Sequence, residues 1–512
     1  MLEVSMGKCI GIIIIMLVSL TITICGCVST KGTAYNPSYK YAPAALQQDY
    51  TLLRNIMQQE HPSIYWYTPK ASMDSAWDAG YKQLKDSLTE QQFKMVISQP
   101  IAHIQCGHTS VRSTKGYDAW LNKANIPYCP LGMRIVSDTM LVSYNLYRKD
   151  TIVPRGSRIL SINGESTALV LHKLYSVIST DGVSNTFKNM KLSNNFPYYY
   201  YQVYDSVKHY TYTYTDSINK VYTAQCSSYI RKPLDTALVR KMIATLPNPI
   251  TPPKQSKRTL RKLHQATQRR LSIDTGNTIA TITLNSFSGR GFKRFTKATF
   301  KTIKKKKIQH VILDVRNNGG GEVSNFVNLT KYLHTSKFKV ADTVVAIKKS
   351  SSYNRYIKYR FWYGISMLYV THKQRDGLQH FGYFERHKYT LKKRLHYNGN
   401  TYIITGGFSF SATTLLVNSL RQVPTVTTVG ETTGGGAYGN SAVYIPNITL
   451  PNSKLRVRLP VFRLVQANAL PKNGMGLVPQ VYVPPTPTTV RNGTDNKMEA
   501  VQQLIKAKQG IK

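Results

Sequence analysis

The second half of the chain alternates apolar runs with segments of helical periodicity, and this alternation limits the fold more than any other feature of the sequence. The runs at 279–284, 310–315 and 402–405 are short, and 310–315 is apolar almost throughout. Such a run is typical of a strand buried on both faces of a parallel sheet. Segments 292–303 and 411–420 have helical spacing. Strands that alternate with helices predict an α/β core.

The first half indicates two regions with different periodicity. Apolar side chains recur at helical spacing between residues 46 and 106, with prolines that break one helix from the next. From residue 126 the pattern changes to short strands. They include 141–144, the four tyrosines 198–201 and an alternation of tyrosine and threonine at 210–214. We therefore expect a helical region and then a β-rich region ahead of the core.

The chain carries a large excess of positive charge. Lysine and arginine number 68 against 24 aspartates and glutamates, which gives a formal net charge of +44 over 512 residues. This excess repels itself unless anionic partners are close. Either a solvated basic surface or contact with anionic lipids or another envelope polymer explains it. Nucleic acid is not expected as a partner, because the sequence has no zinc-finger spacing, basic zipper or aromatic-glycine RNA motif.

The first residues have the pattern of an export signal. Lys8 precedes a long apolar run, and residues 24–27, Ile-Cys-Gly-Cys, resemble the lipobox of bacterial lipoproteins. The resemblance implies a signal peptide over 1–26, a lipidated Cys27 that anchors the protein to the membrane, and a tether over 27–45. The alternative is an uncleaved transmembrane anchor, since the run is nearly long enough to span a bilayer.

Both interpretations place the protein outside the cytoplasm. The absence of acidic residues at 28–32 favours the outer membrane, facing the periplasm. Cys106, Cys129 and Cys226 would remain after export and lipidation, and an odd number does not indicate a disulfide framework. No histidine or cysteine spacing indicates a metal site, and no cofactor is expected.

Two segments that follow expected strands carry residues suited to acyl transfer. The triplet Gly319–Gly321 can turn sharply and expose backbone N–H groups, which suits an oxyanion hole. Ser411 follows another strand and opens a helix, where free N–H groups favour negative charge. Taken alone, a helix N-cap explains Ser411 better than a nucleophile does.

Together these segments resemble the tail-specific, or C-terminal-processing, serine peptidases. Four segments match motifs of that family in the same order: 313–320, 411–412, 429–434 and 474–480. The resemblance implies a ClpP/crotonase-like core with Ser411 as nucleophile. It also implies an oxyanion hole made by the N–H groups of Gly319, Gly320 and Ala412.

A stretch of the β-rich region resembles a PDZ domain. Residues 154–164 match the strand and turn of that domain, with Ser157 where an aspartate is usual, and 169–178 fits its groove helix. PDZ domains bind peptides by strand addition. The alternative is a structural hairpin that binds nothing.

The resemblance points to histidine, and not lysine, as the base. The bacterial processing proteases place a lysine on the turn after the nucleophile helix, but that turn here is glycine-rich, with Gly436 at the expected position. Residues 105–111 resemble the tricorn-like branch, which implies His108 as general base, with Cys106 in place of the usual acid. A neutral imidazole suits this proton transfer. His103 is the competing candidate.

The third catalytic group is the least defined. The tricorn-like branch has a glutamate where this chain has Asn473, and an amide stabilises imidazolium less well than a carboxylate does. Glu431 is a nearby carboxylate in the sequence, but its motif suggests a structural role.

We therefore expect a serine endopeptidase that hydrolyses unstructured polypeptides or C-terminal tails in the cell envelope. The alternatives are a catalytically inactive peptide-binding lipoprotein on the same fold and an envelope tether that acts through its basic surface. The expected segments are a signal peptide, a tether, a helical region, a PDZ-like β-rich region, a basic linker, a peptidase core and a C-terminal tail or helix: 1–26, 27–45, 46–125, 126–230, 231–274, 275–485 and 486–512.

Overall fold

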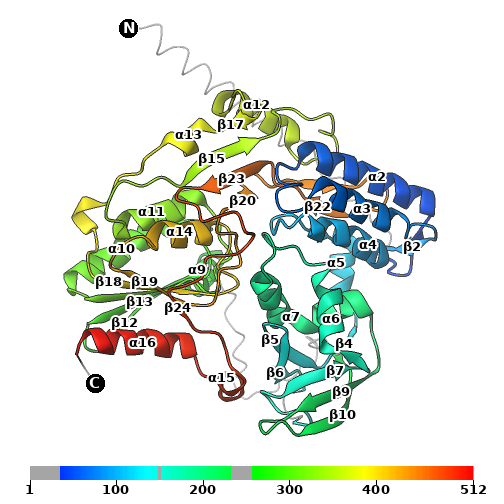
Figure 1. Cartoon of the computed structure of the whole chain (residues 1–512), viewed down its shortest axis with the longest axis horizontal. Coiled ribbons are helices and arrows are strands. Elements are labelled where there is room, and N and C mark those ends of the chain that lie inside the picture. The colour runs from blue at the N-terminus through cyan, green and yellow to red at the C-terminus, as the bar shows by residue number, and fades with distance from the viewer. Residues whose placement is uncertain (1–34, 148–150, 232–255, 511–512) are drawn as a thin grey trace. The chain divides into compact units, whose positions relative to one another are not determined.

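The computed structural model describes residues 35–147, 151–231 and 256–510. The expected signal peptide 1–26, the lipidation site Cys27 and part of the expected tether and linker lie outside the described residues. Residues Tyr39–Lys512 form one compact unit (Figure 1). Within the described ranges, no helix is long and apolar enough to cross a membrane.

A six-stranded sheet forms the centre of the C-terminal half. Its strand order is β12-β13-β14-β18-β19-β24, with the first pair antiparallel and the others parallel. The strands are β12 (Arg269–Ile273), β13 (Ile279–Leu284), β14 (His310–Asp314), β18 (Asn400–Thr405), β19 (Val426–Gly430) and β24 (Val481–Tyr482). The observed bounds of β13, β14 and β18 lie close to those expected, and the predicted α/β class is confirmed.

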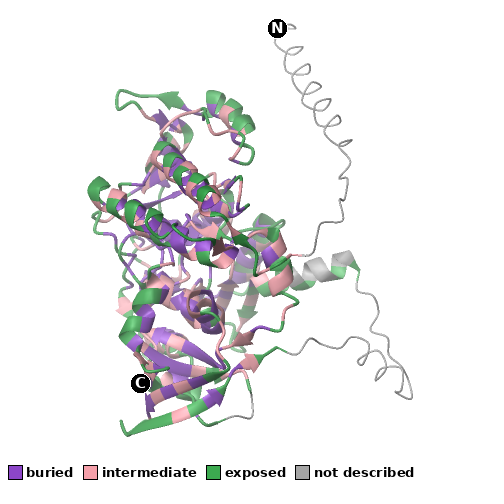
Figure 2. Ribbon diagram, turned by 90° about the vertical axis from the view of Figure 1, so that its right-hand side faces the viewer, coloured by how far each residue is buried: buried purple, intermediate pink, exposed green. Residues whose placement is uncertain are grey.

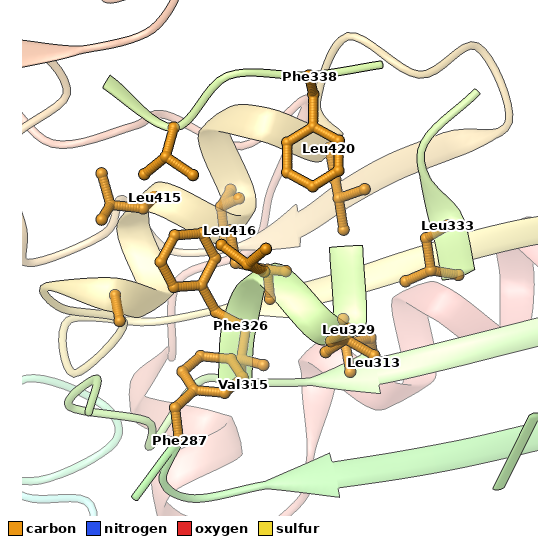
Figure 3. Packing of buried hydrophobic residues seen from close by; sticks show 14 of the residues in the cluster. Phe287, Leu313, Val315, Phe326, Leu329, Leu333, Phe338, Leu415, Leu416 and Leu420 are labelled. Atoms are coloured by element: carbon orange, nitrogen blue, oxygen red, sulfur yellow. The ribbon is translucent and has the colours of Figure 1, made fainter. Parts of the chain in front are cut away.

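Helices cover both faces of this sheet because the strand residues alternate between two cores. Val311 and Leu313 of β14 point into the larger core, and Ile312 points into the smaller one. The larger core is closed by α10 (Phe292–Lys305), α11 (Val323–Leu333) and α14 (Ala412–Leu420). Figure 3 shows its side chains between β14, α11 and α14. The C-terminal helix α16 (Asn496–Lys508) closes the smaller core through Val501 and Ile505. In Figure 2 the strands of this sheet are largely coloured as buried.

A second sheet, of order β16-β17-β15-β23-β20, lies beside the core. Its strands are β15 (Ala341–Ala346), β16 (His372–Lys373), β17 (Gln379–His380), β20 (Gly439–Ala442) and β23 (Phe462–Gln466). Between β15 and β18 the chain also forms α12 (Arg360–Val370), α13 (Gly382–Arg386) and a 3-10 turn (Lys393–Leu395). A short helix, α15 (Pro487–Asn492), precedes α16.

The N-terminal region is helical and is joined to the C-terminal half by a shared small sheet. Its elements are β1 (Lys40–Tyr41), α2 (Pro43–Glu60), α3 (Lys70–Tyr81), β2 (Leu88–Thr89), α4 (Glu90–His103), β3 (Val111–Arg112) and α5 (Lys115–Leu121). Strand β3 pairs with β22 (Arg456–Arg458), which also pairs with β21 (Asn447–Thr449). This pairing fixes the loop between α4 and β3 against the C-terminal half.

The β-rich region is a sheet flanked by two helices. The chain forms β4 (Pro127–Tyr128), β5 (Leu131–Val136), β6 (Thr139–Asn145), β7 (Arg158–Ile162), β8 (Glu165–Ser166), α6 (Thr167–Tyr175), α7 (Thr186–Tyr204), β9 (His209–Thr215), β10 (Val221–Ser227) and β11 (Tyr229–Ile230). The expected hairpin turn follows β7, and the expected helix 169–178 corresponds to α6.

Two expectations about secondary structure are wrong. Residues 198–201 belong to α7 and not to a strand. The buried side chains Leu192, Phe196 and Tyr200 recur every four residues, so the helical period overrides the β propensity of tyrosine. Part of the expected linker 231–274 is also structured: α9 (Lys257–Gln268) leads into β12, which pairs with β13 at the edge of the core sheet.

Candidate active site

The backbone at Ser411 is strained. Ser411 joins the loop after β18 to α14 with φ 57° and ψ −122°, a left-handed conformation that a side chain rarely adopts. Such strain persists where the surroundings enforce it, and it concentrates at functional sites. Ser411 occupies the N-cap position, yet its side chain makes no capping hydrogen bond. Its Oγ instead lies 2.9 Å from Nε2 of His108.

A glycine has to lie beside this serine. A Cβ at Gly320 would come within 2.8 Å of Cβ of Ser411 and within 2.9 Å of the carbonyl oxygen of Phe410. Gly320 also has φ +100°, which only glycine adopts readily. The glycine triplet seen in the sequence therefore permits the close approach of two loops that follow neighbouring parallel strands.

The three expected oxyanion donors differ in their hydrogen bonds. The N–H of Gly320 donates to Oδ1 of Asn318 at 2.9 Å, so it is engaged. Among the residues that the structure describes, no hydrogen bond takes the N–H of Gly319 or of Ala412. Of the three expected donors, Gly319 and Ala412 therefore have N–H groups that no hydrogen bond within the described residues engages.

His108 lies in the loop between α4 and β3 and is buried. Its ring centroid lies 4.8 Å from that of Phe410, which in turn stacks on Phe187. A Cβ at Gly107 would lie 2.6 Å from the Phe410 ring, so the residue before the histidine has to be glycine. Burial, together with the charge of Arg458, lowers the pKa of His108 to about 3. The imidazole is therefore neutral at physiological pH and can accept a proton.

A buried carboxyl group that the sequence did not reveal lies close to this imidazole. Asp181, in the loop between α6 and α7, accepts hydrogen bonds from the N–H of Gly107 at 2.8 Å and of Gly436 at 3.4 Å. Burial raises its pKa to about 7, although both N–H groups act in the opposite direction. Its segment is fixed further by a hydrogen bond from the N–H of Gly182 to the carbonyl of Gln105. Asp181 thus connects the histidine loop to the glycine-rich turn.

Cys106, His108 and Asp181 form a compact buried cluster. One side-chain atom of each, of a kind that binds metals, lies within 4.8 Å of the others. Such a set could hold a metal ion. However, Nε2 of His108 faces Ser411, and both Asp181 oxygens accept from the backbone. Burial raises the pKa of the Cys106 thiol to about 11, which opposes the thiolate that a metal requires. The cluster therefore fits a hydrogen-bonding role better than a metal site.

The structure does not bring Asn473 to the imidazole. Asn473 is exposed, and its Oδ1 accepts from the N–H of Met475 within its own turn. Nδ1 of His108 has no hydrogen-bond partner within the described part of the chain. Asp181 is the acid found near the ring, and its only sequence signal was the Asp-Gly pair at 181–182, just after the expected helix 169–178.

The other residues considered for the catalytic base or third group make contacts elsewhere. Nε2 of His103 lies 2.8 Å from Oγ of Ser72, away from the serine at 411. Glu431 pairs with Arg134 of β5 and with Lys497 of α16, so it links the β-rich region to the core. At Gly436, where the bacterial processing proteases have a lysine, an added Cβ would lie 2.7 Å from the carbonyl oxygen of Gly439, which leaves no room for a longer side chain.

The geometry is that of a nucleophile and a base ready for proton transfer. A hydroxyl and a neutral imidazole lie within hydrogen-bonding distance, two of the expected N–H donors are not engaged within the described residues, and a carboxyl group lies close to the imidazole. This arrangement supports attack on a carbonyl group with stabilisation of the resulting oxyanion.

Comparisons with known proteins agree with this description. Residues 278–483 match the model of peptidase family S41. No curated protein sequence matches the chain.

Among solved structures, mature CPAF complexed with lactacystin is 11% identical, with a TM-score of 0.59 over 92% of this chain and 99% of that one. A point mutant of CPAF is 12% identical, with a TM-score of 0.60 over 88% and 94%. At these identities the likeness concerns the fold alone. The tricorn protease is 12% identical over 91% of this chain and 37% of that one, and its TM-score of 0.39 is too low to support an argument.

Proposed function

Because residues 278–483 match the model of peptidase family S41, we propose that the protein is a serine endopeptidase that cleaves unstructured polypeptides or C-terminal tails. The observation that carries this proposal is the 2.9 Å approach of Oγ of Ser411 to Nε2 of His108. These residues are about three hundred positions apart, and only the complete fold brings them together.

In the proposed reaction, His108 accepts the Ser411 hydroxyl proton while Oγ attacks the carbonyl carbon of the substrate. The N–H groups of Gly319 and Ala412 hold the negative oxygen of the tetrahedral intermediate. The imidazolium then gives its proton to the leaving amine, the C–N bond breaks, and an acyl-enzyme remains. In the second half, a water molecule gives a proton to His108 and attacks the acyl carbonyl. The bond to Oγ of Ser411 then breaks, the acyl group is released, and Ser411 takes back its proton from His108.

We assign Asp181 as the group that stabilises the imidazolium. A carboxylate near the ring offsets the positive charge that forms on His108 during the reaction, which burial alone would oppose. Protonation of Asp181 below its pKa of about 7 removes that charge. Activity is therefore expected to rise with pH through that value.

A pocket beside the site is a candidate for binding the substrate. It has a volume of about 540 Å³ and lies between α4 and α6. Its wall includes Gln105 and Gly182, each adjacent in sequence to a member of the buried cluster. Two lysines, Lys173 and Lys188, line it, and no acidic residue of the described chain does. A positively charged lining suits a polypeptide end that carries a free carboxylate.

The test is hydrolysis of an unfolded protein by the purified chain, with product ends identified by mass spectrometry. We expect internal cleavage by the wild type and none by Ser411→Ala. Ser419→Ala is the matched control, because Ser419 lies on the same helix and its hydroxyl donates to the carbonyl of Leu415 within that helix. Equal cleavage by wild type and Ser411→Ala would refute the proposal.

The second candidate function is peptide binding without catalysis. It is favoured by one observation, the lack of a hydrogen-bond partner for Nδ1 of His108 among the described residues. Under this alternative the chain binds unfolded peptide with equal affinity before and after Ser411→Ala and releases no new chain ends.

We also propose that the protein is exported and held in the cell envelope by lipid on Cys27. Support comes from the lipobox-like residues 24–27 alone. Metabolic labelling with a fatty acid tests this. Label that persists in Cys27→Ser would contradict it.

A further inference from the structure

Helix α12 is held to the protein by one face. Arg360 and Met367 are fully buried, and Tyr363 stacks on Tyr444 at a centroid distance of 3.6 Å. The Arg360 guanidinium donates to the carbonyl oxygens of Lys348 at 3.1 Å and Lys349 at 2.8 Å, and it also pairs with buried Glu60. These contacts fix the orientation of the helix, so its opposite face is presented to solvent in a defined way.

The opposite face is apolar and exposed. Phe361, Trp362, Ile365, Leu368 and Tyr369 are 58%, 56%, 38%, 60% and 87% exposed. The spacing i, i+1, i+4, i+7, i+8 places all five on one side of a helix. Soluble proteins rarely expose a contiguous apolar patch of this kind unless it binds something.

Basic residues flank α12 in the sequence on both sides. Exposed basic residues occur within five positions before and after the helix: Arg355, Lys358, Lys373 and Arg375. The helix itself contains no acidic residue, and Asp376 is the one exposed acid between residues 347 and 390. An apolar face rich in aromatic residues with a basic rim is the pattern of a helix that lies in the interface of an anionic membrane.

The dimensions fit an interfacial helix and not a spanning one. Helix α12 has 11 residues, whereas about 20 are needed to cross the hydrocarbon core. In Figure 1 the helix lies at the margin of the compact unit, beyond β15 and β17. A planar surface can therefore reach its exposed face.

We propose that the exposed face of α12 inserts into the interface of an anionic phospholipid bilayer. A second copy of the chain is the main competing occupant. It would bring two basic rims together in a protein of net charge +44, and like charges oppose that contact. Anionic headgroups complement the same rim. This contact is independent of both the peptidase reaction and the expected lipid on Cys27.

The test uses the full chain and a signal that is local to α12, because an N-terminal anchor would attach any variant to vesicles. Trp362 provides that signal. The chain is mixed with phosphatidylglycerol vesicles whose acyl chains carry bromine, and fluorescence quenching is compared between wild type and Trp362→Phe. We expect the part of the fluorescence that comes from Trp362 to be quenched. This quenching should weaken in phosphatidylcholine vesicles or at high salt. A vesicle-bound chain whose Trp362 contribution is not quenched would overturn the proposal.

A triple variant, Phe361→Ser, Leu368→Ser and Tyr369→Ser, keeps the probe and removes its apolar neighbours. Quenching of Trp362 should fall at least about twofold, because three apolar groups no longer enter the interface. The matched control is Ile218→Ser with Val221→Ser, which removes exposed apolar groups from the β9–β10 hairpin and should leave quenching unchanged. A dimer that forms without lipid and is lost in the triple variant, as shown by sedimentation, would assign the face to a second copy instead.

Discussion

The two sides of the proposed active site are built in different ways. The nucleophile side consists of the loops after β14 and β18, where glycines allow backbones to touch and a strained backbone holds Ser411. The base side consists of His108 and Asp181, which come from two other regions and are held by hydrogen bonds between loops. The first side is encoded in contiguous motifs, whereas the second exists only once distant segments have assembled. We therefore expect substitutions on either side to lower activity, most on the nucleophile side, and we expect a change in pH dependence only on the base side.

The largest effect is expected on the nucleophile side. Ser411→Ala should lower kcat at least about 10,000-fold, because it removes the hydroxyl that lies beside His108. The protein should still fold, since the Ser411 hydroxyl bonds only His108 among the described residues. Steady-state hydrolysis and the melting temperature measure the two outcomes. An active Ser411→Ala enzyme would show that the nucleophile lies elsewhere.

On the base side, Asp181→Asn should lower kcat about 100- to 1,000-fold, because an amide cannot offset the charge of the imidazolium. The wild-type rate should rise with pH through about 7, as Asp181 ionises, and this rise should be absent in the variant. His108 does not account for the rise, since its pKa of about 3 keeps it neutral throughout.

Asn473→Ala is the control for this prediction. Its side chain is exposed and caps its own turn, so kcat should stay within about twofold of wild type. A large loss of activity in Asn473→Ala, with Asp181→Asn unaffected, would show that Asn473 and not Asp181 stabilises the imidazolium.

The packing between the two sides can be tested at Gly107. Gly107→Ala should lower kcat at least about tenfold, because the added methyl group meets the Phe410 ring and displaces the imidazole from Ser411. Gly276→Ala is a useful comparison, since Gly276 has no positive φ and the nearest atom to an added Cβ is a side-chain oxygen of Asp274 at 3.3 Å. Equal activity of both variants would mean that the histidine loop is adaptable.

The smallest effect is expected at the pocket. Lys188→Gln should raise KM about fivefold for peptides with a free C-terminal carboxylate and leave kcat unchanged, since a half-buried lysine contributes modestly to binding. Peptides with an amidated C-terminus provide the control. A similar change in KM for both peptides would argue against recognition of the carboxylate.

The sequence was most informative where structure is local. Strands β13, β14 and β18 and helices α10 and α14 were predicted with close bounds, because apolar periodicity and glycine-rich turns are properties of short segments. The pairing of His108 with Ser411 could be anticipated only through a family resemblance, since the residues meet across the whole fold.

Asp181 could not be found from sequence because its environment comes from Gly107 and Gly436, which lie 74 and 255 positions away. Asn473 was expected as the third group from its place in a motif, but its turn directs the amide to its own backbone. The tyrosines at 198–201 were misassigned because residue type was given more weight than the spacing of Leu192, Phe196 and Tyr200.

The central claim is that His108 activates Ser411, and intact-protein mass spectrometry with a fluorophosphonate probe tests it most directly. We expect one adduct per chain, on the peptide that contains Ser411. We also expect strongly reduced labelling in His108→Ala and normal labelling in His103→Ala. Labelling of Ser411 at the wild-type rate in His108→Ala, or no labelling of the folded wild type, would contradict the claim.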